Sequence, residues 1–87
     1  TKNRIISDYT VSIGTLNASL VHPREVFKEA IKVSACSIIL VHNHPSGDLE
    51  VSEDDLLVTR KLKEGGDVFG IEVIDHLVIG EGSFILV

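Results

Sequence analysis

The order of apolar and polar residues along the chain predicts short strands separated by two helices. Residues 2–6 and 9–13 predict two short strands that meet near Ser7 and Asp8, a turn-prone pair. A continuous apolar run over residues 37–41 predicts a buried strand. Residues 71–79 predict one or two further strands, and residues 83–87 a last strand after a tight turn.

Helical periodicity occupies the two longer intervals between these strands. Pro23 is expected to open the first helix, because its missing N–H costs nothing at the first helical position. The second helix is expected from Ser52 to about Glu64, with Gly65 and Gly66 as its stop. The apolar face of the first helix is expected to consist of Val26, Phe27, Ala30 and Ile31.

These elements predict an α/β fold: a single mixed domain with a curved β-sheet flanked by two helices. The 87 residues make one domain at most, and the 44% hydrophobic fraction is ample for its core. We therefore expect residues 1–87 to form one domain. Because the chain starts without methionine, we expect it to be a fragment of a longer protein.

Charge, hydrophobic runs and cysteine content limit the binding partners and the cellular location that we expect. The formal net charge of −5 argues against a broad nucleic-acid surface, which needs a basic footprint. No apolar run approaches the ~20 residues of a membrane span, and no signal peptide opens the chain. The single cysteine, Cys36, fits a cytoplasmic location. Its apolar neighbours predict that it is buried and unreactive.

The residue types that follow the 37–41 strand predict a metal site. His42 and His44 are two apart, so they share a face if the strand extends that far. Asp55 follows in the first turn of the second helix. Imidazoles and carboxylates are good Zn²⁺ ligands, and three of them plus a water are the usual catalytic layout. We therefore predict that His42, His44 and Asp55 bind Zn²⁺.

Structural alternatives exist for each part of this segment. Ser52 and Asp55 also have the spacing of a helix capping box, which would compete with a metal for the Asp55 carboxylate. The two histidines before Pro45 could belong to an ordinary polar turn. His76 lies among apolar neighbours, so we favour a core histidine with a hydrogen-bond partner. The alternative is that His76 orients a metal ligand or bounds the cleft.

The motif His42-x-His44-Pro45, six residues, then Ser52-x-x-Asp55, resembles the JAMM (MPN+/JAB) metalloprotease signature. Together with residues 14–17, 21–26 and 75–77, it resembles the RadC family of bacterial proteins over nearly the whole chain. The resemblance implies a JAB/MPN-like fold with a cytidine-deaminase-like layout. It also implies a Zn²⁺-dependent hydrolase that cuts amide bonds in a peptide or protein substrate. Ser52 would then be catalytic, by donating to the oxyanion or positioning the water.

One departure from the JAMM pattern bears on activity. JAMM enzymes use a glutamate on an early strand as general base, but no glutamate precedes Glu25 in this sequence. Asp8 is a shorter substitute, and Glu25 falls in the next helix. This departure leaves open a catalytically impaired JAB domain that binds a protein partner. The RadC family name separately suggests a DNA-repair role. The acidic charge gives this role little support.

Overall fold

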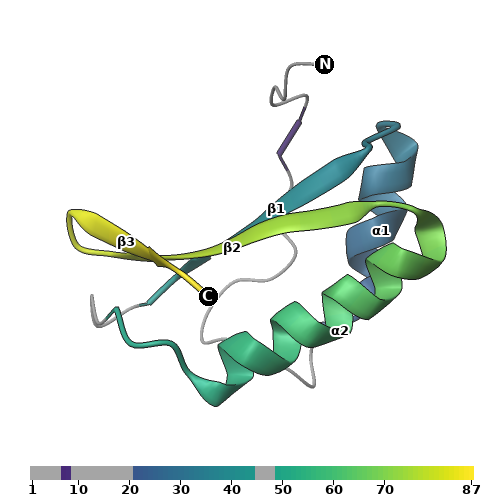
Figure 1. Ribbon diagram of the computed structural model, residues 1–87. Helices are drawn as coiled ribbons and strands as arrows, with labels where there is room; N and C mark the ends of the chain where they lie inside the picture. Colours follow the sequence, from purple (N-terminus) through teal and green to yellow (C-terminus); the bar gives the residue numbers. More distant parts are fainter. Residues whose placement is uncertain (1–6, 9–20, 45–48) are drawn as a thin grey trace.

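The computed structural model describes residues 7–8, 21–44 and 49–87. Within them the chain forms two helices and three strands (Figure 1). In chain order these are α1 (Pro23–Lys32), β1 (Ser37–Asn43), α2 (Glu53–Phe69), β2 (Glu72–Gly80) and β3 (Ser83–Leu86). The α/β class with a mixed sheet and two helices is confirmed. The two strands predicted over residues 2–6 and 9–13 lie outside the described residues.

The three strands form one mixed sheet in the order β1-β2-β3. β1 and β2 are parallel and are joined through α2, whereas β2 and β3 are antiparallel. An irregularity between Ile38 and Ile39 shifts the β1–β2 register by one residue of β2. The residues predicted to form one or two strands thus form a single strand, β2, which starts at Glu72 and leaves out Ile71. That strand, rather than β1, is the middle strand of the described sheet.

Both helices and one face of β1 and β2 share a single core. Phe27 of α1 and Leu62 of α2 are each 1% exposed, and Val73 of β2 belongs to the same cluster, with Ile38 and Leu40 packed against it. The other face of β1 is open in the described part of the chain: Ile39 and Val41 are 50% and 60% exposed. The prediction that this whole run is buried was therefore wrong, because its residues alternate between the two faces.

The predicted apolar face of α1 is only partly buried, and one prediction about burial was wrong. Val26, Phe27 and Ala30 of this face are buried, whereas Ile31 is 52% exposed. Cys36 is exposed rather than buried, because it lies ahead of β1, in the connection from α1. No helix of the described residues is long and apolar enough to cross a membrane.

The end of α2 corrects the predicted helix stop. Gly65 and Gly66 lie inside the helix, which continues to Phe69 and ends at Gly70, whose φ is +69°. The Gly66 carbonyl accepts a hydrogen bond of 2.9 Å from the Ile71 amide. A Cβ on Gly66 would overlap the Ile71 carbonyl oxygen, so this glycine permits a close approach of helix and chain. Gly70 is the left-handed residue that ends the helix.

Candidate metal centre

Three elements bring polar side chains to the end of the core, on the face of the sheet that α2 covers. His42 lies near the end of β1, and His44 follows that strand directly. Asp55 lies in the first turn of α2. His76 is in β2, where it pairs with Leu40, while His42 pairs with Val78 two residues further along. Strand alternation therefore directs His42 and His76 to the same face as the buried Val78.

Asp55 is fully buried and is held by Ser52 through a capping box. The Ser52 backbone N–H and the Ser52 hydroxyl each donate to Asp55 Oδ2, both at 2.8 Å. In return, the Asp55 backbone N–H donates to Ser52 Oγ at 3.0 Å. The capping box that starts α2 thus also holds the Asp55 carboxylate in place next to the histidines of the strands.

The two histidines of the motif contact opposite oxygens of this carboxylate. His42 Nδ1 lies 2.9 Å from Asp55 Oδ1, and His44 Nε2 lies 3.2 Å from Asp55 Oδ2. The two imidazole rings meet edge-on, with centroids 4.8 Å apart. The capping box considered as an alternative is present and uses Oδ2, which His44 also contacts, whereas Oδ1 is contacted by His42. A metal would therefore compete with the cap at Oδ2 but not at Oδ1.

The pKa of Asp55 reflects this environment. Burial by itself raises the pKa of the carboxyl, since a charge is poorly solvated there. The hydrogen bonds from Ser52 and His42, together with the charge of His42, outweigh burial and bring the pKa below its ordinary value. Asp55 is consequently an anion at neutral pH, as a metal ligand must be.

His76 was expected to be a core histidine, with a supporting role beside the metal ligands as the alternative. It is 3% exposed, and its Nδ1 lies 2.7 Å from the hydroxyl of Thr59, so the expected buried histidine with a hydrogen-bond partner is present. Burial lowers its pKa; Asp55 opposes this shift, while His42 and His44 add to it. One ligand atom from each of His42, Asp55 and His76 lies within 4.8 Å of the others.

The types of donor atom fit a zinc ion, because imidazole nitrogens and a carboxylate oxygen are its ordinary ligands. The contacts of 2.9 and 3.2 Å join His42 Nδ1 and His44 Nε2 to different oxygens of Asp55, at hydrogen-bond distance. Among the described residues, the group whose ligand atoms all lie within 4.8 Å of one another consists of His42, Asp55 and His76 and does not include His44. In addition, His42 Nε2 is buried without a hydrogen-bond partner among the described residues. A cation bound to this ring would compensate for such a buried polar atom.

The sequence profile of the RadC-like JAB domain family matches residues 1–86. The chain belongs to the RadC family. Similar curated proteins carry the name UPF0758 protein. One from Methanosarcina barkeri is 56% identical over 85 residues, covering 98% of this chain and 37% of the relative. Another, from Geobacillus thermodenitrificans, is 62% identical over 85 residues, covering 98% of this chain and 38% of the relative.

A third relative, from Clostridioides difficile, is 61% identical over 84 residues, with 97% of this chain and 36% of the relative covered. The chain thus spans little more than a third of the length of the curated relatives it matches. RadC membership together with the His-Asp cluster shows a JAB domain that is compatible with a bound metal ion.

In this RadC domain the structure brings together His42, His44, Ser52 and Asp55, the residues predicted from the motif, and adds His76 to them. That His42, His44 and Asp55 hold Zn²⁺ stays a prediction, as does a catalytic part for Ser52. Neither carboxylate considered as a general base is buried: Asp8 is exposed, and Glu25 projects from α1 with its side chain 49% exposed. Of the loop that follows His44, residues 45–48 lie outside the described part of the chain.

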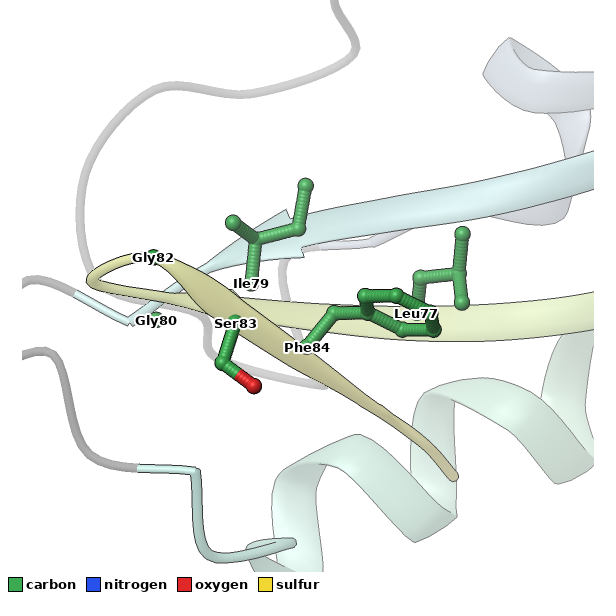
Figure 2. Close-up of a pocket in the computed structure, with 6 residues that line it drawn as sticks. All are labelled: Leu77, Ile79, Gly80, Gly82, Ser83 and Phe84. Carbon is green, nitrogen blue, oxygen red and sulfur yellow. The ribbon is translucent and has the colours of Figure 1, made fainter.

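An apolar hollow at the β2–β3 hairpin lies apart from the cluster. Leu77, Ile79 and Phe84 line it together with Gly80, Gly82 and Ser83 (Figure 2). Leu77 and Ile79 alternate along β2 with the buried His76 and Val78, so they face the opposite side of the sheet. This hollow therefore does not open onto the His-Asp cluster.

Proposed function

We propose that this RadC domain is a Zn²⁺-dependent hydrolase of the JAMM type, which hydrolyses amide bonds in a peptide or protein substrate. One observation carries the proposal: His42 and His44 contact opposite oxygens of the buried Asp55 carboxylate. Such convergence of two imidazoles and one carboxylate is the ligand set of catalytic zinc sites. Amide hydrolysis rests on the resemblance to JAMM enzymes, and the acidic charge of the domain favours a protein substrate over nucleic acid.

When bound, zinc would supply a water acidified towards a pKa of ~7 and would polarise a substrate carbonyl. His42, His44 and Asp55 would hold the ion, and the capping box would keep Asp55 from swinging away. Ser52 would donate a hydrogen bond from its hydroxyl to the substrate oxygen as negative charge develops there, or would position the water. Its proton is directed to Asp55 Oδ2, so this hydroxyl has to rotate to act. Meanwhile the Ser52 backbone N–H retains the carboxylate.

A second function, a JAB domain that binds a protein partner without hydrolysing it, is favoured by one feature of the sequence. Positions 8–13, just ahead of Gly14 and Thr15, contain no glutamate, whereas the RadC pattern leads us to expect the general base of JAMM enzymes a few residues before this Gly-Thr pair. Asp8 would have to take this part through a side chain that is one methylene shorter. Efficient general-base catalysis needs hydrogen-bond reach to the proton that is removed, so the shorter side chain matters.

Elemental analysis of the purified domain tests the metal site, beside the His42→Ala and Asp55→Ala variants. The proposal expects near-stoichiometric zinc in the unchanged protein and its loss in both variants. His22→Ala, at an exposed histidine outside the cluster, is the matched control and should retain the metal. Unchanged protein that takes up no zinc after it is supplied would refute the proposal. Full zinc loading with no peptidase activity in the unchanged protein would favour the binding domain.

A further inference from the structure

The hydroxyl of Thr59 lies between the Asp55 backbone carbonyl and the His76 ring. Because the hydroxyl has a single proton, it can donate only one of the two hydrogen bonds. Thr59 Oγ1 donates to the Asp55 backbone carbonyl at 2.9 Å, and it lies 2.7 Å from His76 Nδ1. A carbonyl oxygen accepts hydrogen bonds and has no proton to give, so the Thr59 proton is used there. The contact with His76 then requires that His76 Nδ1–H donates to Thr59 Oγ1.

This direction of donation fixes the tautomer of His76. A neutral imidazole that carries its proton on Nδ1 has a lone pair on Nε2. Metal-binding histidines commonly donate their other ring N–H to an oxygen, which orients the ring and raises its basicity as a ligand. Here that oxygen belongs to Thr59, and the chain of bonds ends on the backbone of Asp55. The hydrogen bond to Thr59 thereby leaves the His76 Nε2 lone pair free to bind a metal beside Asp55.

The position of His76 agrees with such a role. The ring is buried, and one of its nitrogens shares a 4.8 Å cluster with ligand atoms of His42 and Asp55. Its centroid is 6.4 Å from that of His42. A cation bound between the buried Asp55 carboxylate and the Nε2 lone pair of His76 would be attracted by both.

We propose that His76 is a further ligand of the metal through Nε2, and that Thr59 is the positioning residue that holds it in the required tautomer. The inference rests on the proposed metal site and enlarges its ligand set to three histidines and one aspartate. Zinc sites expand to five ligands during catalysis, so a fourth protein ligand is compatible with a water. The alternative is a structural hydrogen bond that ties α2 to β2 and has no bearing on the metal.

Zinc affinity, measured by competition with a chromogenic chelator, separates these two possibilities. Thr59→Val removes the hydroxyl at nearly constant shape, and we expect binding weaker by about 10- to 100-fold. Thr59→Ser keeps the hydroxyl and should bind within a few-fold of the unchanged protein. For His76→Phe, we expect weaker binding and, by X-ray absorption at the zinc edge, one imidazole fewer around the metal. Circular dichroism of each variant confirms that the fold is retained.

The outcomes distinguish the inference from the proposed function beneath it. Unchanged affinity in Thr59→Val, with an unchanged imidazole count in His76→Phe, would overturn the part given to His76. If His42→Ala lost its zinc in the same series, the metal site itself would stand. Absence of zinc from the unchanged protein would overturn both. Should His76→Phe fail to fold, the comparison of Thr59→Val with Thr59→Ser still decides.

Discussion

Ser52 and Asp55 are joined by three hydrogen bonds, and the Asp55 carboxylate also contacts the rings of His42 and His44. The Ser52 hydroxyl accepts from the Asp55 amide and donates to Asp55 Oδ2, while the Ser52 amide donates to that oxygen as well. Helix capping and the contacts of the two histidines therefore involve the same carboxylate and are not alternatives. A helix start is a rigid support, and function-bearing groups on such supports are positioned more accurately than those on loops.

Replacing Ser52 by alanine should weaken the fold and the metal site together. Loss of an N-cap side chain costs about 1 kcal/mol of stability, and two of the bonds that orient Asp55 disappear with it. We expect a lower urea midpoint in the presence of a chelator and several-fold weaker zinc binding. Ser52→Thr retains a capping hydroxyl and serves as the control. Equal zinc affinity in Ser52→Ala would show that the backbone amide of Ser52 suffices to orient the carboxylate.

The metal-free domain should lose stability as the pH falls below about 6.5, the ordinary pKa of histidine. The folded-state pKa of His76 is lowered, chiefly by burial. The unfolded state therefore binds the proton first, and stability declines as the pH moves from the ordinary pKa down to the folded pKa. The lowered pKa of Asp55 extends this decline to more acidic pH, below the ordinary value of 3.8.

Urea midpoints measured with a chelator between pH 7.5 and 4.5 test this dependence. His76→Gln should flatten the slope, because the group that titrates is gone. His22→Gln changes an exposed histidine and should leave the slope as it is. A slope that persists in His76→Gln would assign the dependence to another group.

The local parts of this structure follow from the sequence, whereas the tertiary parts do not. The capping box, Pro23 at the start of α1 and the His42-x-His44 alternation are short-range patterns with one physical cause each. The inclusion of His76 depends on parallel pairing with β1 and on a register irregularity near Ile38. No spacing along the chain encodes such a pairing. Its position is therefore visible once β1 and β2 lie side by side.

The wrong stop for α2 has a comparable origin. Adjacent glycines usually end helices, but they also allow close backbone approach, and the sequence does not distinguish these uses. Here Gly65 would place a Cβ 2.8 Å from the Phe27 ring, and Gly66 would meet the Ile71 carbonyl. Tertiary contacts with α1 and with the start of β2 decided the outcome.

Gly66→Ala should therefore destabilise the domain, although alanine is the better helix former. The helix gains up to about 1 kcal/mol from the exchange. The overlap with a backbone oxygen forces α2 away from Ile71, and overpacking of this kind costs typically 1–3 kcal/mol. We expect a net loss in the urea midpoint. Glu64→Ala, at an exposed position of the same helix, is the control and should change little. A Gly66→Ala variant that is more stable would contradict the close approach.

Zinc should stabilise the folded domain, because the cluster that would bind it exists in the folded state and not in the unfolded chain. At free zinc about 100 times the dissociation constant, linkage gives roughly 2.7 kcal/mol, which is a readily measured rise in the melting temperature. Asp55→Asn keeps the shape of the side chain but removes its charge, so the rise should disappear. His22→Ala should show the full rise. If zinc raised the melting temperature of Asp55→Asn equally, the ion would be binding elsewhere, and His42 and His44 would lose their assigned part.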